Sequence, residues 1–358
     1  MRLLVLKTGA LGDVLRSTSI LPGLAAAHQD LEVTWITAPA AKPLVAQHPL
    51  VQRVLCVSPK DATAVAELGQ RLSEEPEWDW ILSFDDEEPL CRLASALGSK
   101  RLTGAYSLNS GERAYSDDVA EWFGMGLLSR DGKQAADERK VQNQRSHPQI
   151  FSDMLGIQMG QPELPLSDKV LARAECFATD TRLRSAGLVV GLNTGAGGRW
   201  RTKAMDEAQV VLLAQQLHEH LAGRVTFLLL GGPDEKERNE RLSASMSGAG
   251  LSLVHGGTAN SLEDFAGKVS LCDLLIVSDS MALHVALARH IPVVAFFAPT
   301  SAAEIELYGL GEKVISTAPD YCSYRPDADN STITAERVGA AALRVLAERQ
   351  LGPPLTPS

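Results

Sequence analysis

Several features that mark common protein classes are missing or scarce in this sequence. The five cysteines among 358 residues form no C-x-x-C pair, so there is no sign of a disulfide framework or zinc site, and the pattern fits a reducing cytosol. No run of about 18 apolar residues occurs, and the N-terminal apolar run is too short for a signal peptide. The formal net charge is −10, so the basic footprint of a nucleic-acid-binding protein is absent.

Two common nucleotide-binding motifs are also absent. The glycine-containing turn after the first predicted strand does not read G-x-G-x-x-G, so the fingerprint of a dinucleotide-dependent dehydrogenase is missing. The glycine-rich loop in mid-chain does not match G-x-x-x-x-G-K-[ST], the phosphate loop of many NTPases. What remains is a chain with 45% hydrophobic and 22% charged residues, the composition of a globular protein with room for two domains.

Strand and helix patterns alternate along the chain in two series. The first opens with a strand at 2–6, a helix at 14–28 and a strand at 32–37, the start of a doubly wound parallel sheet. Its remaining elements are predicted as strands at 53–57 and 80–84 and helices at about 40–48, 62–75 and 88–98. The segment 105–145 has a weaker pattern, and we expect a long, mobile excursion there.

The second series follows a linker at 160–165 that contains glycine and two prolines. Its predicted strands are 188–193, 225–230, 251–255, 274–277 and 291–297, and its predicted helices are 168–186, 205–221, 233–246, 261–271 and 281–289. We therefore expect an α/β protein of two Rossmann-like, doubly wound domains, 1–165 and 166–358, facing an interdomain cleft. The tail helix at 334–349 is a candidate to pack back on the first domain.

The first candidate site is the turn Gly9-Ala10-Leu11-Gly12-Asp13, between the first strand and the first helix. Gly9 and Gly12 let the backbone turn tightly and approach a ligand. Asp13 has two interpretations: it caps the helix at 14–28, or it faces the cleft as a general base. Capping would lower its basicity, so the two interpretations compete.

The second candidate site is the loop from Asn193 to Lys203, directly after the first strand of the second domain. Three glycines within the stretch 195–198 expose backbone N–H groups, and three cations follow at Arg199, Arg201 and Lys203. Such a loop is suited to hold a diphosphate through N–H groups and charge. The alternative is a solvated, flexible loop.

The third candidate site follows the strand at 274–277, at the carboxyl end where open parallel sheets bind ligands. A helix that starts there presents N–H groups and a positive dipole end, which suits a phosphate. Ser280 and His284 share one helix face, with Asp279 and Thr300 nearby. The alternatives are that Asp279 is an N-cap and that His284 is a core histidine.

An acidic run, Asp85-Asp86-Glu87-Glu88, follows the strand at 80–84. A solvated helix start is the default interpretation, because acids favour the first turn of a helix. A role in binding an acceptor or a metal stays open.

Three motifs occur in one order: x-x-G-D near the start, N-x-G-A-G-x-x-W-x-x-K in mid-chain, and D-S-x-x-x-H followed by P-V-V-A-x-F-x-P-T. Together they resemble glycosyltransferase family 9, the ADP-heptose heptosyltransferases of lipopolysaccharide core assembly. The resemblance implies the GT-B fold, inversion at the anomeric carbon, and no metal or cofactor. It departs from the family at Arg201, Met205 and Met281, where the family more often has proline, an aromatic residue and glycine.

The resemblance also implies roles for individual residues. Asp13 matches the family's base and Lys203 its phosphate-contacting lysine, while Gly9 and Gly12 form the acceptor-side turn. The remaining donor-side positions are Thr194, Gly195, Gly197, Asp279, Ser280, His284 and Thr300.

The function expected from this resemblance is transfer of a sugar, with heptose as the first candidate, from a nucleotide-diphosphate sugar to a glycan or lipid-linked sugar. ADP-heptose is the expected donor, and lipopolysaccharide core is the expected acceptor. The expected location is the cytoplasm, with peripheral contact at the inner face of the cytoplasmic membrane left open. A sugar-nucleotide epimerase and a non-catalytic sugar-nucleotide-binding protein of the same fold are the alternatives.

Overall fold

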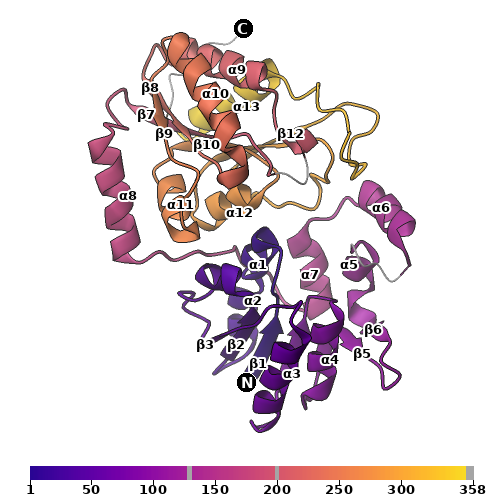
Figure 1. The fold of residues 1–358 in the computed structure, drawn as a ribbon. Helices are drawn as coiled ribbons and strands as arrows, with labels where there is room; N and C mark the ends of the chain where they lie inside the picture. Colours follow the sequence, from indigo (N-terminus) through magenta and orange to yellow (C-terminus); the bar gives the residue numbers. More distant parts are fainter. Residues whose placement is uncertain (127–130, 198–200, 352–358) are drawn as a thin grey trace. The chain divides into compact units, whose positions relative to one another are not determined.

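The computed structural model describes residues 1–126, 131–197 and 201–351, and the chain divides into two compact units, Met1–Pro165 and Leu166–Ser358 (Figure 1). Each unit is built on one six-stranded sheet. The strands of unit 1 are β1 (Arg2–Leu6), β2 (Glu32–Thr37), β3 (Arg53–Cys56), β4 (Trp80–Ser83), β5 (Leu102–Ser107) and β6 (Arg113–Tyr115). Those of unit 2 are β7 (Leu188–Asn193), β8 (Val225–Leu229), β9 (Leu253–His255), β10 (Leu274–Ser278), β11 (Val293–Phe297) and β12 (Gly311–Ile315).

Unit 1 has the strand order β3-β2-β1-β4-β5-β6, parallel except for the antiparallel edge pair β5 and β6. Its central strand β1 is an apolar run buried on both sides, as a parallel strand covered by helices requires. The helices of unit 1 are α1 (Leu11–Ser17), α2 (Ile20–Ala27), α3 (Ala62–Ser73), α4 (Glu88–Ala96), α5 (Ala120–Gly124), α6 (Lys133–Gln142) and α7 (His147–Leu155), with short 3₁₀ turns η1 (Pro39–Leu44) and η2 (Asp117–Val119).

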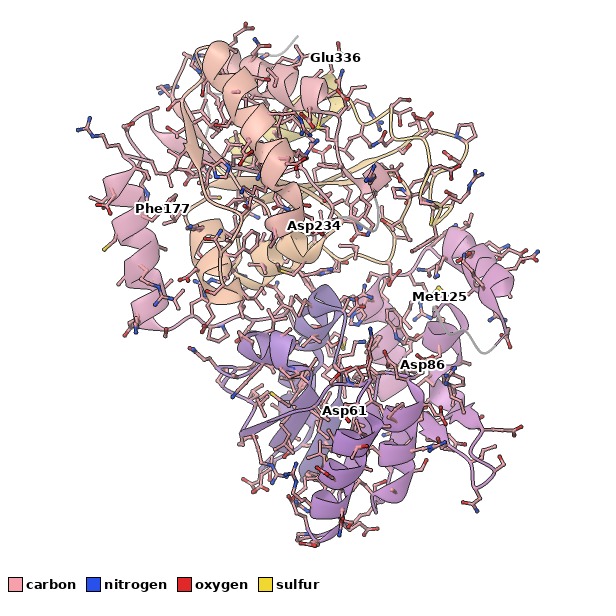
Figure 2. All side chains as sticks on the ribbon, viewed as in Figure 1. Asp61, Asp86, Met125, Phe177, Asp234 and Glu336 are labelled. Atoms are coloured by element: carbon pink, nitrogen blue, oxygen red, sulfur yellow. The ribbon has the colours of Figure 1, made fainter. Side chains whose placement is uncertain are left out.

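Helices α3 and α4 cover one face of this sheet. Leu68 and Leu72 of α3 and Leu93 of α4 pack in one apolar cluster with Leu4 of β1. The helix α3 begins at Asp61, whose carboxylate accepts a hydrogen bond from Ala64 N–H at 3.0 Å (labelled in Figure 2). The apolar spacing of α3 and this cap explain why the helix predicted at 62–75 forms.

Two predictions for unit 1 are wrong in detail. The helix expected at 14–28 is two helices, because the hydroxyls of Thr18 and Ser19 bond back to the carbonyls of Leu15 and Arg16 at 2.7 and 2.6 Å and end the first one. The helix expected at about 40–48 is the shorter 3₁₀ turn η1. The described part of the segment 105–145 carries the hairpin of β5 and β6 and the helices α5 and α6, while residues 127–130 lie outside the description.

Unit 2 has the strand order β12-β11-β10-β7-β8-β9, with every pair parallel. Its edge strand β12 was not predicted, because Gly311-Glu312-Lys313 interrupts the apolar pattern. The helices of unit 2 are α8 (Asp168–Asp180), α9 (Glu207–His220), α10 (Lys236–Gly248), α11 (Leu262–Val269), α12 (Met281–Ala288) and α13 (Ala335–Glu348), with 3₁₀ turns η3 (Arg201–Lys203) and η4 (Pro233–Glu235).

The tail helix α13 belongs to the core of unit 2. Val338, Ala342 and Val345 pack in one apolar cluster with Leu213 of α9 and Val294 of β11. Thr334 caps this helix by accepting a hydrogen bond from the N–H of Arg337. The tail helix, which was a candidate to pack on the first domain, thus buries these apolar residues within unit 2.

Both sheets follow the same doubly wound order. In unit 1, β2 and β3 lie on one side of β1 and β4 lies on the other, so the strand order reverses between β1 and β4. In unit 2, it reverses between β7 and β10. Such topological switch points leave room at the carboxyl ends of the two central strands, where ligands bind in open α/β sheets. The loops after β1, β4, β7 and β10 contain most of the candidate residues.

Replacing Gly104 tests how closely β5 packs against the end of β4, beside the switch point of unit 1. The φ of Gly104 is +125°, and an added Cβ would lie 1.9 Å from the carbonyl oxygen of Ser83 at the end of β4. Gly111 has φ +87° with open space around it. Urea unfolding should therefore show that Gly104→Ala loses about 3 kcal/mol and Gly111→Ala about 1 kcal/mol. Equal losses would contradict this packing.

Candidate functional site

An ion pair joins the loops that follow β7 and β10 in unit 2. The Nζ of Lys203 donates to the Oδ2 of Asp279 at 2.8 Å and to its backbone oxygen at 2.9 Å. The hydroxyl of Thr300, which follows β11, donates to the same Oδ2 at 2.7 Å. The carboxylate of Asp279 thus joins Lys203 and Thr300, two predicted site residues that are far from each other in the sequence.

The charge on Asp279 is strongly favoured at this position. Burial opposes ionisation, but the ammonium of Lys203, the hydroxyl of Thr300 and the nearby imidazole of His284 together lower the pKa of Asp279 to about 2. The side chains of Lys203 and Asp279 are each only 15% exposed, and His284 is 7% exposed in the second turn of α12. The carboxylate of Asp279 therefore stays ionised at every ordinary pH.

The helix α12 begins at Ser280, not at Asp279. Ser280 is the N-cap residue, and its hydroxyl makes no hydrogen bond to the helix. Asp279 is held by Lys203, so its interpretation as an N-cap is wrong. Met281 is the first helical residue and has ordinary helical backbone, so the usual glycine is not needed at this position.

The glycine loop after β7 is tied down by Glu235 of η4. One oxygen of this carboxylate accepts the N–H of Gly197 at 2.6 Å, and the other accepts the N–H of Gly232 at 2.8 Å. An added Cβ on Gly195 would lie 2.4 Å from the Cγ of Glu235, and Gly197 has φ +69°. The described end of this loop is therefore ordered, while Gly198, Arg199 and Trp200 lie outside the described residues.

Arg238 of α10 forms further hydrogen bonds with the same loop. Its guanidinium donates to the hydroxyl of Thr194 at 3.2 Å and to the carbonyl of Met205 at 2.6 Å. Thr194 is 2% exposed, and Met205 is 1% exposed in the core of unit 2. This burial explains why Met205, which departs from the family pattern, fits here: it fills apolar space.

The loops after β1 and β4 in unit 1 are joined in a similar way. The carboxylate of Asp85 pairs with the ammonium of Lys7 and accepts hydrogen bonds from the backbone N–H of Thr8 and, at 2.6 Å, from its hydroxyl. Asp85 is 5% exposed, so the interpretation of this residue as part of a solvated helix start is wrong. Burial opposes the charge on Lys7, yet Asp85 and Asp13 raise the pKa of Lys7 above its ordinary value.

Asp13 lies in the first turn of α1 but does not cap it. The N-cap position is Ala10, so the capping interpretation of Asp13 is wrong. Its Oδ1 is paired with the guanidinium of Arg16 at 3.0 Å, and its side chain is 37% exposed. The turn before it is open at Gly9, where an added Cβ would meet nothing within 4 Å, and Gly12 is buried in the helix.

Asp86 and Glu87 follow Asp85 after the end of β4, while Glu88 starts α4 and is exposed, as the interpretation of a solvated helix start predicts. Burial raises the pKa of Asp86, against a hydrogen bond from the hydroxyl of Tyr115 at 3.0 Å (Asp86 is labelled in Figure 2). Burial and the charge of Asp85 raise the pKa of Glu87. These carboxylates are therefore more basic than exposed ones, a property that the sequence alone did not reveal.

Residues that the motifs did not single out complete both sites: Lys7, Thr8, Arg16, Glu235 and Arg238. The signal that could have found Lys7 and Asp85 is position, because a lysine and an aspartate directly follow two strands that are neighbours in this strand order. The partners Arg16, Glu235 and Arg238 carry no such signal, since helix surfaces are rich in these residue types.

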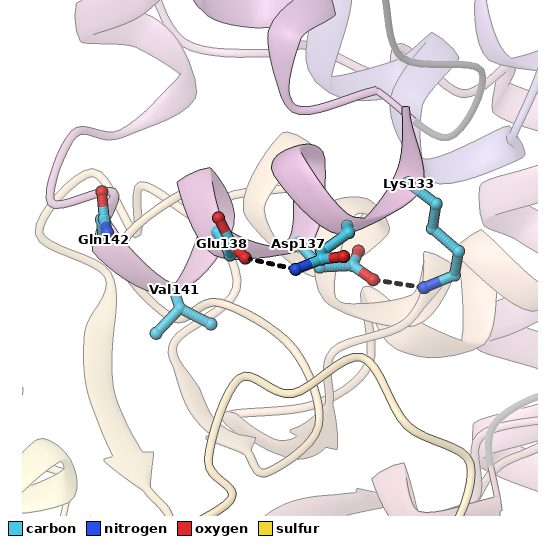
Figure 3. A pocket seen from close by; sticks show the side chains of 6 residues that line it. Lys133, Asp137, Glu138, Val141 and Gln142 are labelled. Carbon is cyan, nitrogen blue, oxygen red and sulfur yellow. Dashed lines mark hydrogen bonds and ion pairs between the residues drawn. The ribbon is translucent and has the colours of Figure 1, made fainter. Parts of the chain in front are cut away.

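A hollow on the surface of α6 lies apart from these residues. It is lined by Lys133, Gln134, Asp137, Glu138, Val141 and Gln142 (Figure 3). Its polar side chains pair along the helix, for example Gln134 with Glu138 at 3.0 Å, and none of them belongs to a predicted site.

The described residues contain no group of three or more His, Cys, Asp or Glu side chains that could hold a metal ion. Among their helices, none is both long and apolar enough to cross a membrane.

Comparison with known proteins identifies the family. A family model described as glycosyltransferase family 9 (heptosyltransferase) matches residues 113–332, more than half of the chain. The chain belongs to glycosyltransferase family 9. It is 25% identical over 337 residues to lipopolysaccharide heptosyltransferase 1 of Pseudomonas aeruginosa, covering 92% of this chain and 90% of that relative.

Solved structures agree on the fold. A family 9 glycosyltransferase from Veillonella parvula superimposes with a TM-score of 0.77 at 17% identity, covering 97% of each chain. ADP-heptose lps heptosyltransferase II of E. coli gives a TM-score of 0.67 at 17% identity, covering 98% of this chain and all of the other. The predicted family, the α/β GT-B fold and the identity of the chain as a glycosyltransferase are confirmed.

The buried pair in this glycosyltransferase should govern part of its acid stability. The pKa of Asp279 is lowered from 3.8 to about 2, so the stabilisation is complete above pH 4 and is lost as the pH falls toward 2. In urea unfolding at pH 7, Asp279→Asn should lose about 2–4 kcal/mol, and the difference from the parent should be about half as large at pH 3. Thr300→Val, which removes one hydrogen bond, should lose about 1 kcal/mol. A difference that stays constant down to pH 3 would contradict the assignment.

Proposed function

We propose that this glycosyltransferase transfers a heptose from ADP-heptose to a hydroxyl of a glycan, with inversion at the anomeric carbon and without a metal ion. The observation that carries the proposal is the arrangement of Lys203, Asp279 and Thr300 beside the glycine loop at the switch point of unit 2. The names of the relatives, a lipopolysaccharide heptosyltransferase and an ADP-heptose lps heptosyltransferase, support the choice of donor and acceptor.

Unit 2 binds the donor in this proposal. The diphosphate lies at the amino terminus of α12, beside Ser280 and His284, with Lys203 as the nearest cation and Thr194, Gly195 and Gly197 along the loop after β7. Asp279, whose carboxylate accepts a hydrogen bond from Thr300, holds the ammonium of Lys203 in place, so little reorganisation is needed when the diphosphate takes on negative charge. Preorganised donors of this kind stabilise developing charge by about 3 kcal/mol.

Unit 1 activates the acceptor in this proposal. Asp13, beside the turn of Gly9 and Gly12, accepts the proton of the attacking hydroxyl. The hydroxyl oxygen forms a bond to the anomeric carbon as the bond from that carbon to the phosphate oxygen breaks, and the nucleoside diphosphate leaves with the bonding electrons. Attack from the face opposite the leaving group inverts the anomeric centre.

The acceptor in this proposal is a lipid-linked sugar such as lipopolysaccharide core. An acceptor of that kind brings the enzyme to the inner face of the cytoplasmic membrane by peripheral contact. The elevated pKa values of Asp86 and Glu87 at the end of β4 make these carboxylates suitable hydrogen-bond partners for sugar hydroxyls on the acceptor side.

Replacing Asp13 tests the catalytic assignment. Asp13→Asn should lower kcat by about 10²–10⁴-fold and leave donor affinity within about twofold, because the carboxylate acts on the acceptor. Turnover is measured as the release of ADP from ADP-heptose with an acceptor present, and the anomeric configuration of the product is read by NMR. Full turnover in the variant would remove Asp13 from the mechanism, and release of an epimer without any acceptor would favour an epimerase instead.

Replacing Lys203 tests the donor site. ADP should raise the melting temperature of the parent more than UDP or GDP, because ligand binding stabilises the folded state by mass action. Lys203→Ala should weaken ADP binding by at least about tenfold, as expected for a charge-assisted contact. Arg201→Ala, an exposed cation in the same turn, is the matched control and should bind nearly as the parent does. The donor model fails if no nucleoside diphosphate shifts the melting temperature.

A further inference from the structure

Arg16 holds the carboxylate of Asp13 in a defined place. The two residues lie one helical turn apart on α1, and the Nη2 of Arg16 is 3.0 Å from the Oδ1 of Asp13. The side chain of Arg16 is only 11% exposed, whereas that of Asp13 is 37% exposed. The guanidinium is thus a largely buried group that contacts a more accessible carboxylate, unlike an ordinary surface pair, in which both partners are solvated and mobile.

A second contact fixes the guanidinium itself. Its central carbon lies 5.0 Å from the ring centre of Trp122 on α5, within the range of a cation–π interaction. Trp122 meets His147 and Phe151 of α7 edge-on, with ring centres 5.2 and 5.0 Å apart. Phe151 in turn contacts Phe84, which directly precedes Asp85. A continuous aromatic cluster therefore anchors Arg16 to the loop after β4.

The surrounding charges alternate in sign. Lys7 and Asp85 form one pair, and Arg16 and Asp13 form the other, and the charges of both Asp13 and Arg16 act on Lys7. Loss of Arg16 would remove the guanidinium contact that fixes the Oδ1 of Asp13. A carboxylate that rotates away from the attacking hydroxyl loses the alignment on which proton transfer depends.

We propose that Arg16 is the positioning residue for Asp13: the guanidinium, clamped against Trp122, aims the carboxylate at the acceptor hydroxyl. The proposal rests on the proposed role of Asp13 as the base. It gives a function to α5, in the segment 105–145, because Trp122 of this helix contacts the guanidinium of Arg16.

The test compares Arg16→Met, Arg16→Lys, Asp13→Asn and the double variant Asp13→Asn with Arg16→Met, in the full-length protein. Arg16→Met should lower kcat by about 10–10²-fold at an unchanged KM for the donor, and Arg16→Lys should recover part of the loss. In the double variant, the loss should equal that of Asp13→Asn alone, because the positioning residue has nothing left to position. Arg92→Met, which removes an exposed helical pair with Glu88, is the matched control and should keep full turnover.

The aromatic clamp gives an independent variant. Trp122→Leu should lower kcat by about three- to tenfold, and Trp122→Phe should restore most of it, because a phenyl ring still offers a face to the guanidinium. Melting temperatures separate these effects from unfolding. Losses of Arg16→Met and Asp13→Asn that multiply in the double variant, or full activity of Arg16→Met, would overturn the proposal. Full activity of Asp13→Asn would instead overturn the assigned base.

Discussion

In each sheet, a buried lysine–aspartate pair lies beyond the carboxyl ends of the two central strands, at the switch point. In unit 2 the pair is Lys203 with Asp279, and in unit 1 it is Lys7 with Asp85. In chain order, each pair joins a loop that follows the first strand of its sheet to one that follows the fourth, so it links the two loops at the switch point. Removing one member of such a pair strands a charge in a poorly solvated place, which is why both loops depend on the complete pair.

In unit 2, further polar contacts order the loop that follows β7. Glu235 holds the N–H groups of Gly197 and Gly232, and Arg238 holds Thr194. Glycine at position 195 is required because Glu235 passes too close for any side chain. Each unit thus combines an apolar sheet core with a polar rim whose groups are already oriented before a ligand arrives, and preorganisation of this kind is what lowers the cost of binding and of charge development.

The sequence predicted most of the fold, because alternating apolar strands and amphipathic helices carry strong periodic signals. It missed β12, whose polar residues hide the strand, and it joined α1 and α2 into one helix, because the competition of the Thr18 and Ser19 hydroxyls with the helix is a local effect that apolar spacing does not show. For the site, the resemblance to the family implied that Lys203, Asp279 and Thr300 belong to one donor site, and in the structure these three residues are in contact. The sequence could not show that Asp85 is buried or that Arg16 and Trp122 stand behind Asp13, because these contacts depend on tertiary packing between distant segments.

The pairing of these charges also affects the electrostatic field that a charged molecule meets at a distance from the protein. Lys203 and Asp279 sum to zero formal charge, as do Lys7 and Asp85, so each pair acts as a dipole whose field decays faster than that of a single ion. In a chain of net charge −10, these pairs provide little long-range attraction for an anionic nucleotide. These groups therefore distinguish one ligand from another only through direct contact. Their contribution to the rate at which a nucleotide encounters the protein should be nearly insensitive to ionic strength.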